Sequence, residues 1–310
     1  MMKRPTIVVV GSVNTDLTVQ ASRVARPGET LLGRDFSVSH GGKGANQAVA
    51  AARLGASVTF VGCVGCDTFG DNAVAALAAE GIDTRFIRRD VDCPSGVALI
   101  VVGDDGENSI IVAPGSNATL STHDVEAAAD VFRIADVVLT QLEVPIVTVE
   151  KTLCVGRSNG AITILNPAPA QRLPQSVFDL TDWLTPNETE AALLTGVENE
   201  NPGEFASVGN RLIESGVGNV VVTRGSAGAT YVSTQEMSEV ESFHVDAIDT
   251  VGAGDAFNGA LAVALGSGFT VPEAMRFASA AAAISVTRRG AQASMPMIDE
   301  VERLMRNGTA

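Results

Sequence analysis

The sequence Asp249-Thr250-Val251-Gly252-Ala253-Gly254-Asp255-Ala256-Phe257-Asn258-Gly259 places a Gly-Ala-Gly turn directly before a carboxylate and opens an alanine-rich stretch. A helix that starts on such a turn can aim bare backbone N–H groups at an anion. A carboxylate beside that anion site can take a proton from a hydroxyl close to a phosphate. Residues 249–259 therefore favour a phosphate-binding helix start with Asp255 as a base. A plain helix-capping role for Asp255 is the alternative.

A second glycine-rich segment, Gly41-Gly42-Lys43-Gly44-Ala45-Asn46-Gln47, opens another alanine-rich stretch about two hundred residues earlier. It fails the P-loop pattern, because Gly44 follows Lys43 where Ser or Thr is required. Neither glycine-rich segment has the spacing of a dinucleotide-binding turn. Together the two segments predict a small-molecule kinase that uses neither motif.

Composition limits the class of protein. The chain has 310 residues, of which 45% are apolar, so it can bury a large core. The apolar run Ile7 to Val10 is too short for a signal-peptide core, and we expect a cytoplasmic protein with no membrane span. A net charge of −15 argues against nucleic acid as a partner. Cys63 and Cys66 form a C-x-x-C spacing without a second ligand pair, so we expect them to be packing residues.

Short apolar runs alternate with helical patterns along most of the chain. Such runs, rich in Val and Ile, indicate a parallel sheet that helices cover on both faces. A predicted hairpin (97–102 and 109–112) and an extended segment (30–39) break this rhythm, and we expect them to form a small accessory sheet. The expected strands of the main sheet are 7–10, 58–61, 137–140, 162–165 and 220–223, and the expected helices are 45–54, 71–80, 257–265 and 273–286, with Asp71 as the cap of the second.

An ordered set of short motifs resembles the PfkB carbohydrate kinase family, and within it the ribokinases. The resemblance extends over nearly the whole chain. Its motifs are Gly11-Ser12-Val13-Asn14-Thr15-Asp16, Gly41 to Gln47, Gln141-Leu142-Glu143, Asn166-Pro167-Ala168-Pro169-Ala170, Thr185-Pro186-Asn187-Glu188-Thr189-Glu190, Asp249 to Gly259, and Thr287-Arg288-Arg289-Gly290-Ala291-Gln292.

This resemblance implies a ribokinase-like α/β fold, with a central, mostly parallel sheet, flanking helices and a β-sheet lid. It implies one kinase domain over residues 1–310, with the lid strands inserted at about 15–40 and 96–113, and a homodimer formed through the lid. The implied reaction is ATP-dependent phosphorylation of D-ribose at its 5-hydroxyl, with Mg²⁺ as cofactor and K⁺ as activator.

The resemblance also assigns the catalytic and sugar-binding residues. Asp255 is implied to be the general base, and the N–H groups of Gly252, Ala253 and Gly254 are implied to form the anion hole. The sugar-binding positions are Asn14, Asp16, Gly42, Lys43, Asn46 and Glu143. Taken singly, these six residues also fit ordinary turns, a helix start and a solvated carboxylate.

The nucleotide and cation sites follow in the same way. Asn187 and Glu190 are implied to organise Mg²⁺, water and phosphates, although a helix-capping pattern after Pro186 is the alternative. The implied nucleotide contacts are Thr223, Gly225, Ser226, Gly228, Gly254 and Ser279, where Ser279 replaces the histidine of the familiar ribokinase. The implied monovalent-cation loop comprises Asp249, Val251, Ser285, Arg288, Gly290 and Ser294, mostly through backbone carbonyls; a turn-forming role is the alternative for Asp249.

Two other functions fit parts of this pattern. One is a related kinase of deoxyribose, another sugar or a nucleoside, although aromatic residues suited to base stacking make up only 4% of the chain. The other is a catalytically idle sugar-binding protein, against which the intact Gly-Ala-Gly-Asp segment argues.

Overall fold

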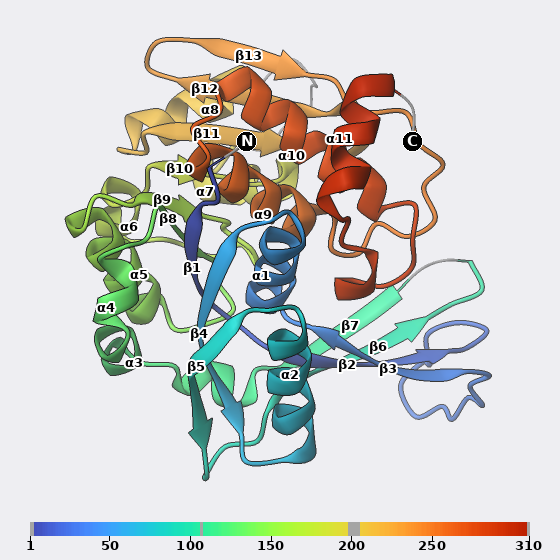
Figure 1. Cartoon of the computed structure of the whole chain (residues 1–310). Helices are drawn as coiled ribbons and strands as arrows, with labels where there is room; N and C mark the ends of the chain where they lie inside the picture. The colour runs from blue at the N-terminus through green and yellow to red at the C-terminus, as the bar shows by residue number, and fades with distance from the viewer. Residues whose placement is uncertain (1–2, 106–107, 198–204, 309–310) are drawn as a thin grey trace.

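The computed structural model describes residues 3–105, 108–197 and 205–308 as a large sheet with helices on both faces and a smaller sheet beside it (Figure 1). The large sheet has nine strands in the order β13-β12-β11-β10-β9-β8-β1-β4-β5. All pairs from β11 to β5 are parallel, and β12 and β13 add an antiparallel edge. This confirms the predicted α/β class. The strands are β1 (Thr6–Val10), β4 (Ser57–Gly65), β5 (Asp83–Asp90), β8 (Val137–Thr140), β9 (Ile162–Leu165), β10 (Trp183–Leu184), β11 (Asn219–Thr223), β12 (Ala229–Ser233) and β13 (Met237–Val240).

The central strands are apolar on both sides because helices cover both faces. In β1, Ile7 and Val9 belong to one buried cluster, whereas Val8 and Val10 belong to another. The first cluster packs under α1, α2 and the C-terminal helices, and the second under α3 to α8. The helices are α1 (Lys43–Arg53), α2 (Thr68–Ala79), α3 (Thr122–Ala127), α4 (Ala129–Phe132), α5 (Ile146–Ser158), α6 (Gln175–Asp179), α7 (Glu188–Thr195), α8 (Phe205–Glu214), α9 (Ala253–Gly266), α10 (Val271–Ser285) and α11 (Ile298–Asn307), with 3₁₀ turns η1 (Gly115–Thr119), η2 (Gly225–Ala227) and η3 (Gln292–Ser294). None of the helices within the described ranges is long and apolar enough to cross a bilayer.

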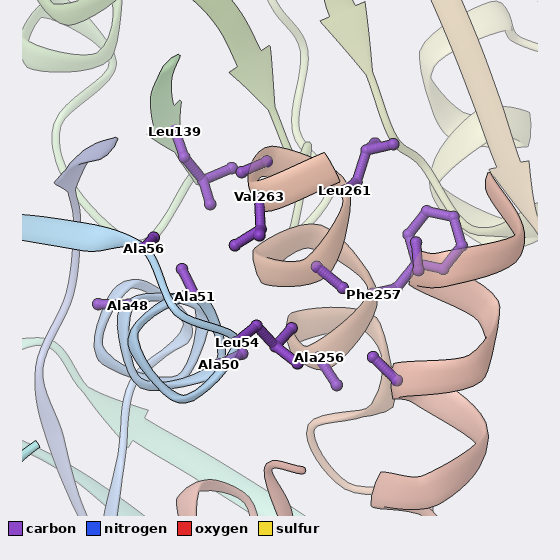
Figure 2. Packing of buried hydrophobic residues seen from close by; sticks show 14 of the residues in the cluster. Ala48, Ala50, Ala51, Leu54, Ala56, Leu139, Ala256, Phe257, Leu261 and Val263 are labelled. Carbon is purple, nitrogen blue, oxygen red and sulfur yellow. The ribbon is translucent and has the colours of Figure 1, made fainter. Parts of the chain in front are cut away.

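Helices α1 and α9 pack closely against each other (Figure 2). Their contact brings the two glycine-rich segments together, because Asn46 and Gln47 hydrogen-bond to Asp255. Small side chains line the contact, among them Ala50, Ala51 and Ala256. A Cβ on Gly259 would lie 2.7 Å from the carbonyl oxygen of Gln47 and 2.6 Å from the Cβ of Ala50. Only glycine allows this approach, and it sets the start of α1 against the start of α9.

The smaller sheet has the order β3-β2-β6-β7 and lies beside the start of α1 (Figure 1). Strands β6 and β7 form the predicted antiparallel hairpin. The expected extended segment 30–39 is only partly a strand, because pairing with β2 begins at Phe36 and continues to Gly41. The strands of this lid are β2 (Asn14–Gln20), β3 (Phe36–Gly41), β6 (Gly96–Val102) and β7 (Asn108–Ala113).

Two helix starts differ from the sequence prediction. Asp67, not Asp71, caps α2: its Oδ1 atom accepts a hydrogen bond from the N–H of Gly70 at 2.8 Å. Helix α9 starts at Ala253 rather than Phe257, so Asp255 lies within its first turn.

Candidate active site

The candidate site lies where the parallel strands end and at the start of α1 and α9. Asn14 is the first residue of β2, directly after the loop that follows β1. The loop after β8 supplies Glu143, and Asn187 follows β10. In open α/β sheets, ligands bind outside the carboxyl ends of the strands. The sequence-predicted residues therefore converge on the edge of the sheet where a ligand is expected.

Asp255 is buried, with a side chain fixed by two amides of α1. Its Oδ2 atom accepts from Nδ2 of Asn46 at 2.9 Å, and its Oδ1 atom accepts from Nε2 of Gln47 at 3.0 Å. Burial raises the pKa of Asp255, although Lys43 and the two amides favour the ionised form and partly oppose the rise. A carboxylate with a raised pKa and a fixed orientation is suited to accept a proton.

The backbone just before Asp255 forms the predicted turn. Gly252 adopts a left-handed conformation with φ of 79° and directly precedes the first helical residue, Ala253. The first N–H groups of a helix have no partner inside it, and that of Ala253 makes only a long, 3.3 Å contact with the carbonyl of Thr250. A Cβ on Gly254 would meet nothing within 4 Å, so space is open above this turn. An anion can therefore approach the start of α9.

The start of α1 is held by Glu143. Its Oε2 atom accepts from the backbone N–H of Lys43 at 3.0 Å and from the hydroxyl of Ser12. A carboxylate is favourable at this positive end of a helix. Gly42 precedes the helix with φ of 90°, and a Cβ there would lie 2.7 Å from the backbone nitrogen of Asn14. The loop after β1 and the start of α1 thus pack directly on each other.

The side chain of Lys43 places a positive charge beside the carboxylates of the candidate site. Burial opposes its charged form, but attraction to Asp255, Glu143 and Glu190 outweighs that effect and raises the pKa of Lys43. Lys43 therefore stays protonated among three carboxylates. It can balance their charge and that of an incoming phosphate.

Asn14 and Asp16 lie on β2, at the border between the lid and the main sheet. The Oδ1 atom of Asn14 accepts from Nδ2 of Asn117 at 2.8 Å. The carboxylate of Asp16 lies against Gly41, where a Cβ would be 2.3 Å away. Burial, with repulsion from Glu143 and Asp255, raises the pKa of Asp16 to about 6.

A cavity of about 410 Å³ adjoins these residues. Asn14 and Glu143 line it, but Asp255 does not, so the cavity lies beside the carboxylate cluster rather than around it. Its remaining wall comes from β7, η1, the start of α5 and the loops after β7, β8 and β9, including Asn117, Leu142 and Gln171.

Asn187 and Glu190 form a reciprocal capping box at the start of α7. The N–H of Glu190 donates to Oδ1 of Asn187, and the N–H of Asn187 donates to Oε2 of Glu190, both at 2.8 Å. The capping alternative is thus realised in the structure. Burial raises the pKa of Glu190, while its bond to Asn187 and the charge of Lys43 oppose the rise. The carboxylate consequently lies within the electrostatic reach of the Asp255 site as well as capping the helix.

The predicted nucleotide loop follows β11 directly. Thr223 pairs with Asn187, which connects this loop to the start of α7. The N–H of Arg224 donates to the carbonyl of Gly228 at 2.8 Å, and Gly228 has φ of 88°, which closes a tight loop with Gly225 and Ser226 at its exposed tip. Ser279 is buried on α10, 8% exposed, and nothing in its contacts assigns it to a ligand.

Two of the predicted cation residues, Val251 and Gly290, donate backbone hydrogen bonds to the carboxylate of Asp249. Its Oδ1 atom accepts from the N–H of Val251 at 3.0 Å, and its Oδ2 atom accepts from the N–H of Gly290 at 2.9 Å. The hydroxyls of Ser285 and Ser294 donate to carbonyls of their own segments. The Arg288 guanidinium pairs with Glu300 on α11, so its side chain is directed to that helix. Within the described ranges, no group of three or more His, Cys, Asp or Glu side chains could hold a metal ion.

Sequence reasoning assigned no role to the amides that orient these groups. Gln47, Gln141, Asn166 and Asn117 are all buried and hydrogen-bonded near the site. Gln47, Gln141 and Asn166 lie within the family motifs. Their position in these motifs was the only sign in the sequence that they lie near the site. Cys63 is buried and Cys66 is exposed; both are free thiols.

Comparisons with known proteins identify the family of the chain. Residues 4–298 match the pfkB family of carbohydrate kinases. A ribokinase of Haemophilus influenzae is 43% identical over 96% of this chain and 97% of its own length, and a deoxyribokinase of Salmonella typhi is 38% identical over 95% and 96%. The structure of Arabidopsis thaliana ribokinase complexed with ribose and ATP superposes with a TM-score of 0.91, at 33% identity, and covers 98% of this chain and 99% of that one. The chain therefore belongs to the pfkB family of carbohydrate kinases.

Proposed function

We propose that this enzyme transfers a phosphoryl group from ATP to the 5-hydroxyl of D-ribose. The observation that carries the proposal is Asp255: a buried carboxylate, oriented by two amides, in the first turn of a helix whose start is open to an anion. Relatives named as ribokinases, similar over nearly their full length, supply the choice of sugar.

Asp255 accepts the proton of the sugar hydroxyl as the new P–O bond forms. The backbone N–H groups of Gly252, Ala253 and Gly254, at the positive end of α9, stabilise the negative charge on the transferring group. Lys43 adds a fixed positive charge. Because these groups are in place before charge develops, little reorganisation is needed in the transition state.

The sugar pocket comprises the loop after β1, the lid strand β2 and the start of α1. Its proposed residues are Asn14, Asp16, Gly42, Lys43, Asn46 and Glu143. Hydrogen bonds and close contacts between the segments that carry them support this grouping. Asn14 is oriented by Asn117 so that its own amide donor is directed away from that bond. Asn46 has a buried Oδ1 atom without a protein partner among the described residues, and a sugar hydroxyl would satisfy it. Unpaired polar groups of this kind give selectivity for a polyol.

The nucleotide lies on the other side of Asp255. Thr223, Gly225, Ser226 and Gly228 form a loop that permits close approach of phosphates. Gly254 on α9 and Ser279 on α10 are the further proposed contacts of the nucleotide. Glu190 provides one partly buried carboxylate. This fits Mg²⁺, which takes most of its oxygen ligands from phosphates and water and would neutralise charge on the β- and γ-phosphates.

K⁺ is the proposed activator. The donor set fits it: one carboxylate, Asp249, which already joins two loops, and backbone carbonyls of the segments carrying Val251, Ser285, Arg288, Gly290 and Ser294. A bound cation would stiffen the backbone leading into the anion-binding turn and touch no substrate.

Exposed apolar side chains on the lid support the proposal that the protein is a homodimer. Three of the lid strands, β3, β6 and β7, expose large apolar side chains, which are Phe36, Val38, Leu99, Ile110, Ile111 and Val112. Exposed apolar sets of this size on one sheet indicate an interface. We infer a single kinase domain over residues 1–310, with lid strands at about 15–40 and 96–113, that works in the cytoplasm, where ATP is available.

A coupled ADP-release assay with a panel of sugars tests the proposal. D-Ribose should give the highest kcat/KM, and 2-deoxyribose is the first competitor to include, because a deoxyribokinase is among the similar relatives. Preference for 2-deoxyribose would change the substrate but keep the kinase class. No ADP release with any sugar would contradict the proposal and favour an idle sugar-binding protein.

A further inference from the structure

Gln47 is a buried amide that contacts the proposed base without access to solvent. It lies on α1 and is 0% exposed. Its Nε2 atom donates to Oδ1 of Asp255 at 3.0 Å and to Oδ1 of Asn166 at 3.1 Å, and its Oε1 atom accepts from Nε2 of Gln141 at 2.6 Å. A side chain so enclosed cannot touch a substrate. Any effect it has on the reaction must act through Asp255.

The direction of these hydrogen bonds is fixed at one end by a backbone carbonyl. The carbonyl of Thr185 can only accept, and Nδ2 of Asn166 donates to it at 3.1 Å. The Oδ1 atom of Asn166 must therefore face Gln47, which requires the Nε2 atom of Gln47 on that side. The NH₂ group of Gln47 thus points at both Asn166 and Asp255.

Gln141 closes the network at the other end. With its NH₂ group committed, Gln47 presents Oε1 to Gln141, and only the Nε2 atom of Gln141 can donate to it. A flipped Gln47 would place two acceptors against each other at Asp255 and two donors at Gln141. The orientations of the three amides, Asn166, Gln47 and Gln141, therefore support one another.

We propose that Gln47, held in one orientation by Gln141 and Asn166, is a positioning residue that fixes the carboxylate of Asp255 for proton transfer. The inference rests on the proposed role of Asp255 as the base. Asn46 and Gln47 each hold one oxygen, so the carboxylate can rotate only by breaking a hydrogen bond. Both donors lie on α1, whose distance from α9 is set by the close contact at Gly259.

Removing the Gln47 donor should also change how Asp255 titrates. The charged groups that face Asp255 are Lys43 on α1, Glu143 after β8, Asp16 on β2 and Glu190 on α7. None of them changes in a Gln47 variant. The lost hydrogen bond stabilised the ionised form more than the neutral acid, so the acid limb of the kcat profile should move to higher pH.

The test compares Gln47→Met and Gln141→Met with Asp255→Asn and with a control, Thr152→Val. Thr152 is fully buried on α5, on the opposite face of the sheet, and its hydroxyl donates to the carbonyl of Thr148. Thr152→Val thus removes a buried hydrogen bond from a part of the fold that does not contact Asp255. Melting curves and ribose binding by calorimetry check the fold of each variant.

We expect Gln47→Met to lower kcat about ten- to a hundredfold, with KM for ribose and ATP within about twofold of the wild type and the acid limb at higher pH. Gln141→Met should change kcat and pH profile in the same direction but less, and Thr152→Val should change neither.

Wild-type kcat and pH profile in a folded Gln47→Met enzyme would overturn the inference. If Gln47→Met does not fold, Gln141→Met decides, and an unchanged profile there overturns it equally. Substantial turnover in Asp255→Asn would instead overturn the proposed function itself, so the two failures are distinguishable.

Discussion

The carboxylate of Asp249 accepts a hydrogen bond from the N–H of Gly290 at 2.9 Å, across 41 residues of sequence. The same carboxylate accepts from Val251, which begins the path into the anion-binding turn. The backbone N–H groups of Ile248 and Asp249 both donate to the carbonyl of Val286. Two loops are therefore joined at one acidic residue, next to the proposed phosphate site.

K⁺ should activate phosphorylation more than Na⁺ or Li⁺ does. A site made chiefly of carbonyls suits a large, weakly hydrated ion, and a firmer loop keeps the N–H donors of the turn in place. The measurement is the initial rate in K⁺-free buffer and with each chloride at matched ionic strength. Asp249→Ala should lose the K⁺ response, whereas Asp246→Ala, an exposed carboxylate earlier in the same loop, should keep it. Equal rates with all three ions would contradict the cation site.

Asp255→Asn should abolish nearly all turnover but keep the fold. Asn cannot accept the hydroxyl proton, and its single oxygen can satisfy only one of the two amides that now donate to Asp255. Loss of a general base costs on the order of a hundred- to ten-thousand-fold in rate. Single-turnover kinetics and ribose calorimetry separate chemistry from binding. Near-normal turnover in this variant would remove Asp255 from the mechanism.

The main sheet could be predicted because its strands are continuous apolar runs. The strands β1, β8, β9 and β11 are short runs rich in Val and Ile. Such runs indicate a sheet that is buried on both faces. The residues at which helices start were harder to predict than the strands. Asp71 resembles a cap, but Asp67 is one turn earlier and also accepts from Ser95, a tertiary contact that local sequence does not reveal.

The charged residues that we propose to face the ligands could be picked out in the sequence, whereas the amides that hydrogen-bond to them could not. Asp255, Lys43 and Glu143 stand out as charges in glycine-rich or apolar surroundings. Nothing in the sequence distinguishes the amides of Gln47 and Asn166 from others. Only the fold shows that these two residues, 119 positions apart in the sequence, are hydrogen-bonded to each other. Asn187 and Glu190 show the reverse: their local pattern predicts a cap, and the structure contains that cap.

Ile111→Asp should convert the proposed dimer to a monomer. Ile111 is 65% exposed on the lid strand β7, and a carboxylate buried in an apolar interface is costly. Light scattering coupled to size exclusion gives the mass. Ile134→Asp is the matched control, because Ile134 is 68% exposed but lies outside the lid, between α4 and β8. A dimer that survives Ile111→Asp, or one lost in both variants, would contradict the lid interface.

Asp16 should make sugar binding depend on pH near 6. Its pKa is raised to about 6 by burial and by the charges of Glu143 and Asp255, so the carboxylate that we propose pairs with sugar hydroxyls is lost as the pH falls through that value. Ribose affinity, measured by calorimetry, should weaken between pH 7 and 5. Asp16→Asn should bind ribose more weakly than the wild type at pH 7 and show a flatter profile.

The raised pKa of Asp16 also predicts how the stability of the folded protein depends on pH. Whereas ribose binding should weaken as the pH falls, the stability contributed by Asp16 should increase. The folded state binds the Asp16 proton more tightly than the unfolded state, whose pKa is near the ordinary 3.8. The stability that this proton provides is therefore present below about pH 4 and lost as the pH rises through 6. At pH 8 the ionised carboxylate disfavours folding, and Asp16→Asn should raise the free energy of unfolding by about 1–2 kcal/mol once solvent screening is allowed for. Urea titrations at pH 8 and pH 4 test this, with the exposed Asp130→Asn as a control that should change little at either pH. A variant no more stable than the wild type at pH 8 would show that the folded protein does not oppose the charge of Asp16, and the predicted pH dependence of ribose binding would lose its basis.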